Sequence, residues 1–98
     1  MLDALMLFPK SIEPEALDRI AATLVPFIKQ SSGLRSIRVN DGDIMSRGGP
    51  PPYVMVIEAS FGSLADWMGL VDALKQRKDF AEIDRTPPLI MYFEVREP

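Results

Sequence analysis

The sequence contains no cysteine and no histidine among its 98 residues. The lack of cysteine excludes disulfides, thiolate ligation of zinc or iron–sulfur clusters and thiol nucleophiles, and it fits a reducing compartment. The lack of histidine removes the commonest metal ligand and the usual general base near neutral pH. A histidine-containing catalytic triad therefore cannot be built from this chain.

Long apolar runs and an excess of positive charge are also missing. Eleven basic residues against 14 acidic ones give a net charge of −3, which disfavours nucleic acid as a partner because a phosphate backbone attracts a positive field. The longest uncharged apolar stretches, such as residues 20–28, are too short to span a bilayer, and the chain opens without a basic leader. We expect a cytoplasmic protein of one domain, residues 1–98, without membrane or nucleic-acid partners.

The hydrophobic pattern predicts four strands and two helices. Strands are expected at residues 1–8, 34–41, 53–61 and 89–96, and helices at residues 13–30 and from Ser63 onward. Pro26 should kink or end the first helix near Leu24. Ser63 and Asp66 form a near capping box for the second helix, whose expected buried stripe is Leu64, Trp67, Met68, Val71 and Leu74.

Two connections carry fewer signals. Residues 41–52 hold three glycines and three consecutive prolines, which indicates a long exposed connection within the domain. Residues 79–85 look irregular or briefly helical. Asp41 and Asp43 do not complete a calcium loop, and Gly48 and Gly49 lack the lysine of a phosphate loop.

The element order β-α-β-β-α-β predicts an α+β, ferredoxin-like fold: a four-stranded antiparallel sheet with both helices on one face. Alternation along each strand assigns a nearly pure apolar set to the helix side, with Leu89, Met91 and Phe93 among its members. The opposite set mixes apolar and polar side chains and contains Asp3, Leu5, Leu7, Ser36, Arg38, Asn40, Val54, Val56, Glu58, Ser60, Ile90, Tyr92, Glu94 and Arg96.

Aliphatic residues on that opposite face would form a patch unusual for a soluble monomer. A second copy, packed sheet against sheet about a two-fold axis, is the economical cover. The sequence thus predicts a homodimer through the open sheet face, with polar side chains around a cavity that holds a small apolar or aromatic ligand.

The predicted open face also carries the candidate chemistry. Glu58 could act as a base, Arg38 could stabilise a developing oxyanion, and Tyr92 could donate a hydrogen bond to a carbonyl. The alternative is that Glu58 and Arg38 form an internal ion pair. The expected ligand-binding residues are Asn40, Val56, Ile90 and Glu94. No metal site is expected, because the carboxylates of this face lie at well-separated strand positions.

Several short motifs, in order along the whole chain, give the sequence a family resemblance. They are Val25-Pro26, Gly33-Leu34-Arg35, Pro52-Tyr53, Phe61-Gly62-Ser63-Leu64 and Tyr92-Phe93-Glu94-Val95. With them the chain resembles the EthD-like family of dimeric α+β barrels, whose members are often linked to the breakdown of small organic compounds or to natural-product pathways. Members often carry a histidine just before the Val-Pro pair, where this chain has Leu24, so mechanisms and haem ligation through that imidazole are excluded here.

Two functions remain. The first is binding, or transforming without a metal or redox cofactor, a small hydrophobic or aromatic carbonyl compound, with Glu58, Arg38 and Tyr92 as catalytic groups. The second is a non-catalytic ligand-binding or accessory dimer. No residue constellation compels catalysis, so the sequence leaves both open, together with the question of whether residues 41–52 form a lid.

Overall fold

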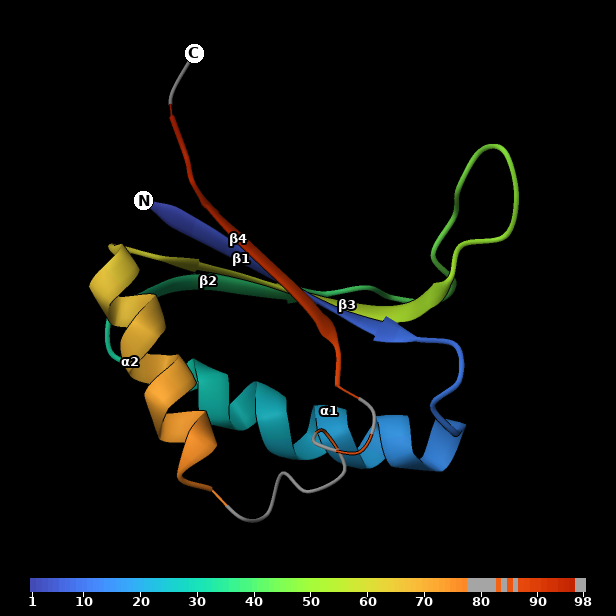
Figure 1. Ribbon diagram of the computed structural model, residues 1–98, viewed down its shortest axis with the longest axis horizontal. Helices are drawn as coiled ribbons and strands as arrows, with labels where there is room; N and C mark the ends of the chain where they lie inside the picture. Colours follow the sequence, from blue (N-terminus) through green and yellow to red (C-terminus); the bar gives the residue numbers. More distant parts are fainter. Residues whose placement is uncertain (78–82, 84, 86, 97–98) are drawn as a thin grey trace.

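The computed structural model describes residues 1–77, 83, 85 and 87–96. Its elements are β1 (Leu2–Pro9), α1 (Pro14–Lys29), β2 (Leu34–Val39), β3 (Tyr53–Phe61), α2 (Leu64–Lys75) and β4 (Leu89–Glu94). The predicted β-α-β-β-α-β order is confirmed. Both helices lie on one face of the sheet and leave the other face bare (Figure 1). Most of the segment 79–85, predicted as irregular or briefly helical, lies outside the described residues.

The sheet has the antiparallel order β2-β3-β1-β4. The two central strands, β1 and β3, turn alternate apolar residues toward the helices, where they are buried. The core comprises Leu2, Ala4, Met6, Phe8, Ile12, Ile20, Leu24, Ile28, Met55, Ile57, Ala59, Phe61, Trp67 and Leu70. This is the ferredoxin-like architecture expected from the element order.

Helix α1 follows the predicted stripe, with Ile20, Leu24 and Ile28 buried. Pro14 occupies its first turn, where no backbone N–H is needed. Of the two effects predicted for Pro26, an end of the helix near Leu24 is wrong, because the helix continues to Lys29. Only about one turn follows Pro26, and the carbonyl left without its usual donor belongs to the exposed Ala22, where water can satisfy it.

Helix α2 begins as predicted, since the hydroxyl of its N-cap residue Ser63 accepts a hydrogen bond from the backbone N–H of Asp66. Its buried face matches the prediction in part, since Trp67 is buried and Val71 and Leu74 pack against the core. Trp67 and Leu70 are buried, whereas Leu64 and Met68 are exposed. Apolar residues occur all around this helix, so its sequence specifies the buried direction only weakly.

Two of the sequence landmarks meet at one corner of the fold. The N–H of Gly62, between β3 and α2, donates a 2.9 Å hydrogen bond to the carbonyl of Gly33, between α1 and β2. Gly33 has a φ of +79°, and Asp66 lies directly against it. A glycine is therefore needed at position 33, where the two connections approach each other closely.

No helix in the described ranges combines the length and the hydropathy that crossing a bilayer would require.

Candidate functional site

The open face of the sheet is organised in rows across the four strands. The register aligns Ser36, Ser60, Asp3 and Phe93 in one row and Arg38, Glu58, Leu5 and Met91 in the next. In a third row Val56, Leu7 and Leu89 are aligned. The polar side chains thus gather over β2 and β3, with Asp3 beside them, whereas the β1 and β4 side is apolar.

Arg38 and Glu58 form an ion pair across β2 and β3. The Arg38 guanidinium donates to the Glu58 carboxylate at 3.0 Å, and the two residues are direct cross-strand partners. The Arg38 side chain is 74% exposed and that of Glu58 is 33% exposed. Of the two alternatives left by the sequence, the ion pair is the arrangement present, and it occupies the carboxylate that a base would need free.

A second polar pair lies beside the first. The Ser60 hydroxyl donates a 2.6 Å hydrogen bond to the Asp3 carboxylate, which satisfies a largely buried serine. Sequence reasoning placed both residues on this face but did not foresee their pairing, which requires the β1–β3 register.

Asn40, predicted to bind ligand, is instead engaged with the backbone. Its side-chain amide donates to the carbonyls of Gly42 at 2.8 Å and Val54 at 3.2 Å, and its side-chain oxygen accepts from the N–H of Val56 at 2.9 Å. Asn40 therefore holds the base of the 41–52 connection, which projects beyond the sheet (Figure 1). The side chain of Val56, another predicted ligand-binding residue, lies on the open face as expected.

The predicted orientation of β4 is wrong. Its register with β1 pairs Ala4 with Tyr92 and Met6 with Ile90, so these residues and Glu94 lie on the helix side. The open face instead receives Leu89, Met91 and Phe93. Five consecutive apolar residues give this strand no alternation from which its direction could be read. Tyr92 is consequently on the opposite side of the sheet from Arg38 and Glu58, and the three cannot form one site within a chain.

The helix side of β4 borders a pocket of about 200 Å³. This helix-side pocket is lined by Met6, Leu24, Trp67, Val71, Leu74, Lys75, Ile83, Pro88 and Ile90. Lys75 is the only charged residue among them. The position at which EthD-like proteins often carry histidine contributes an apolar wall here, as Leu24.

Trp67, which lines this pocket, carries a buried polar group. The residue is 1% exposed, and its ring lies 5.7 Å from the ring of Phe61 and 5.7 Å from that of Tyr92, measured between centroids. Its indole Nε1 is fully buried and has no hydrogen-bond partner in the part of the chain that the structure describes. A buried N–H usually finds an acceptor, because leaving it unpaired costs about 1–3 kcal/mol.

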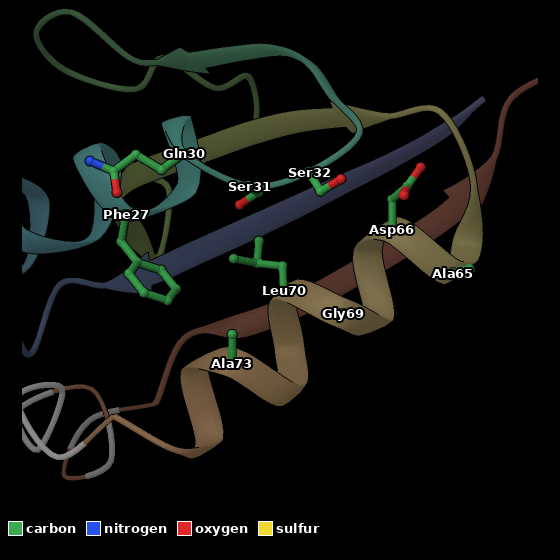
Figure 2. A pocket seen from close by; sticks show the side chains of 9 residues that line it. All are labelled: Phe27, Gln30, Ser31, Ser32, Ala65, Asp66, Gly69, Leu70 and Ala73. Carbon is green, nitrogen blue, oxygen red and sulfur yellow. The ribbon is translucent and has the colours of Figure 1, made fainter.

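A second depression of about 410 Å³ runs between the two helices. Figure 2 shows Phe27, Gln30, Ser31 and Ser32 at the end of α1 facing Asp66, Gly69 and Ala73 of α2. The Asp66 carboxylate already accepts a 3.0 Å hydrogen bond from Ser63, and the Arg77 guanidinium lies 5.0 Å from the centre of the Phe27 ring. Asp66 of this interhelical groove thus serves the start of α2, whereas the buried Ser31 hydroxyl has no hydrogen-bond partner among the described residues.

Across the described residues, no cluster of three or more acidic side chains is placed to hold a metal ion. On the open face, the Glu58 carboxylate is paired with Arg38 and the Asp3 carboxylate accepts a hydrogen bond from Ser60.

Comparisons with known proteins identify the fold. No family model matches the chain, and no curated protein does. Among solved structures, an EthD family protein from Bacillus halodurans superposes with a TM-score of 0.73 at 15% identity, covering 98% of this chain and 99% of the other. SnoaB, a cofactor-independent oxygenase from Streptomyces nogalater, superposes with a TM-score of 0.72 at 10% identity, covering 99% and 94%.

A dimeric ferredoxin-like protein of unknown function from Thermobifida fusca gives a TM-score of 0.70 at 14% identity, covering 96% of this chain and 90% of the other. The chain therefore has the fold shared by EthD proteins and other ferredoxin-like structures, over nearly its whole length. The likeness to the EthD fold that the sequence landmarks implied is confirmed at the level of architecture.

Proposed function

We propose that this protein binds a small, largely apolar molecule carrying an acceptor oxygen, such as an aromatic ketone, in the helix-side pocket. The buried Nε1 of Trp67 is the observation that carries this proposal. The N–H is covered in the unliganded protein, and a ligand oxygen that reached it as the covering side chains shift would supply its missing hydrogen bond, while Leu24 and Ile90 would contact the apolar part of the ligand.

The chemistry of the pocket favours a neutral ligand. Among the described residues its lining is aliphatic and aromatic apart from Lys75, and an anionic ligand would exchange its hydration for a mainly apolar surface. A ketone, quinone or ether oxygen needs only one good donor. The proposed ligand thus belongs to the same class as the aromatic carbonyl compound expected from the sequence, but it would bind at a different site.

Binding is better supported than catalysis. The ion pair of Arg38 and Glu58 lies on the other face of the sheet, so neither group is available to a molecule in the pocket. Among the described residues, the ionisable group in the pocket lining is Lys75, and Tyr92 lies behind that lining in ring contact with Trp67. Transformation of the ligand without a cofactor is the second candidate; deuterium incorporation next to the carbonyl of a bound ketone, followed by NMR, would report it.

The second part of the proposal is that two copies pair through their open faces. Leu5, Leu7, Leu89, Met91 and Phe93 form an adjoining apolar area on β1 and β4, and exposed apolar areas of this kind mark interaction sites. The face carries Arg38 together with the acidic Glu58 and Asp3, so it can complement itself about a two-fold axis. Structural neighbours described as dimeric support the pairing of two copies.

The ligand proposal is tested with 1-tetralone, a bicyclic aromatic ketone, and tetralin, the matched hydrocarbon without the oxygen. Calorimetric titration should show that Trp67→Phe weakens tetralone binding by about two- to twelve-fold, the equivalent of one net hydrogen bond. Tetralin binding should change by a smaller factor, because this control reports only the altered shape of the pocket.

Equal losses for the two compounds would show that Trp67 contributes packing alone. No binding of tetralone at millimolar concentration would equally overturn the proposed pocket.

A further inference from the structure

Strand β4 lies between the two surfaces that the proposed function uses. Its alternate residues Leu89, Met91 and Phe93 belong to the open face, while Ile90 lines the helix-side pocket and Tyr92 contacts Trp67. Successive side chains of a strand point to opposite faces of the sheet, so the residues of the two faces are joined by the same backbone. Any displacement of β4 therefore alters both surfaces together.

The strand is also the least covered part of the sheet. It is an edge strand, and all six of its residues are exposed. The contrast with its partner is direct: on the helix side Ile90 is 44% exposed and Tyr92 is 51% exposed, whereas Met6 and Ala4 opposite them on β1 are buried. The helices thus cover β1 but not β4.

What holds β4 within one copy is mainly its ladder with β1, together with a 2.8 Å hydrogen bond from the N–H of Val95 to the carbonyl of Met1. Elements with few buried apolar contacts open at low free-energy cost. A second copy packed on Leu89, Met91 and Phe93 would add the burial that the strand lacks in a single chain.

We propose that pairing of two copies and occupancy of the helix-side pocket are positively coupled through β4. This inference rests on both parts of the proposed function. Covering the open side of β4 restrains the strand and so places Ile90 and Tyr92 against the pocket. The pocket of a single copy is incomplete in this sense, because one of its walls depends on the partner. By linkage, a pocket ligand strengthens the dimer in return.

The first test needs no variant. The dimer dissociation constant of the full-length wild-type protein is measured by sedimentation with and without saturating 1-tetralone. Couplings between sites commonly change affinity by about 5- to 150-fold. Each dimer holds two pockets, so saturating ligand should lower the dimer dissociation constant by the square of the factor by which pairing raises the affinity of one pocket. Saturating tetralin should lower the dimer dissociation constant by most of the same factor.

The second test uses two substitutions that place a charge in the open face. Met91→Asp lies on β4 itself, whereas Val56→Asp lies on β3 and does not line the pocket. Both should give monomers, and both should weaken tetralone binding by at least about five-fold. Circular dichroism and the emission of the single tryptophan verify that each monomer is folded.

The outcomes separate the inference from the proposals beneath it. A wild-type protein that dimerises and binds tetralone, but whose dimer dissociation constant is unchanged by the ligand, would refute the coupling alone. Loss of binding in Met91→Asp but not in folded Val56→Asp would also refute it, because the effect would then be local to β4. A monomeric wild type, or one that does not bind tetralone, would instead refute the corresponding part of the proposed function and the coupling with it.

Discussion

Substitution of Gly33 by alanine tests the corner where the connections around β2 and α2 meet. Gly33 has a φ of +79°, and a Cβ added there would lie 2.2 Å from Cγ of Asp66 and 2.3 Å from its Oδ2. No rearrangement of the new methyl group can relieve these contacts, so the Asp66 side chain must move. Asp66 is the third residue of α2, and its carboxylate accepts the 3.0 Å hydrogen bond from the N-cap Ser63.

The expected cost has two parts. A left-handed backbone conformation costs an alanine about 1–2 kcal/mol relative to glycine. Displacing the carboxylate costs about 0.5–1.5 kcal/mol more, the usual net worth of one hydrogen bond. Gly33→Ala should therefore lower the free energy of unfolding by about 1.5–3.5 kcal/mol.

Urea-induced unfolding, followed by the emission of Trp67 at one fixed protein concentration, measures this change. The matched control is Gly69→Ala in the middle of α2, where no atom of the described residues lies within 4 Å of the added Cβ. That substitution should stabilise the protein by about 0.5–1 kcal/mol, because alanine favours a helix over glycine.

In an Asp66→Ala background the contact with the carboxylate is gone, and the cost of Gly33→Ala should fall to the backbone part alone. A Gly33→Ala protein as stable as the wild type, or an unchanged cost in the Asp66→Ala background, would refute the geometry of this corner.

Two further predictions concern residues of the open face. Asn40→Ala removes three hydrogen bonds to the backbone and should destabilise the protein by about 1–3 kcal/mol; an unchanged urea midpoint would contradict the role of Asn40 at the base of the 41–52 connection. Arg38→Ala removes one arm of an exposed ion pair, so stability should change by less than about 1 kcal/mol, and at a protein concentration that keeps the variant dimeric the tetralone affinity should stay the same in calorimetry. Loss of binding in a dimeric Arg38→Ala protein would place the ligand on the open face instead.

The proposed binding site lies on the opposite side of the sheet from the predicted one, because the orientation of strand β4 was predicted incorrectly. Residues 89–93 are all apolar, so no polar residue marks the solvent-facing side of this strand. Either set of alternate residues could therefore face the helices. Strand β3 differs, since Glu58 and Ser60 alternate with Ile57 and Ala59 and fix its direction. The same reasoning applies to α2, where Leu64 and Met68 were expected inside and are exposed.

The indole N–H of Trp67 that is unpaired among the described residues could not be predicted from the sequence for a different reason. Its helical position predicts a packed aromatic, and it is one. That its indole N–H remains without an acceptor among the described residues depends on which side chains surround it in three dimensions. No spacing in the sequence carries that information, because the neighbours come from three separate elements.

Local patterns in the sequence were sufficient for the element order, the ferredoxin-like architecture, the Ser63 cap and the inward face of α1 and of the central strands. These features follow from periodicity, from caps and from the handedness of crossover connections, all of which act over short stretches of chain.

The tertiary structure alone decided which face of β4 meets the helices, that Arg38 pairs with Glu58, and that Trp67, whose indole N–H is buried, lines an apolar pocket. The physical reason is that strand register and burial arise from contacts between residues far apart in sequence. Where the two sets of alternate residues in a strand are equally apolar, those contacts decide which set faces the helices. They thereby also decide on which side of the sheet a ligand would bind.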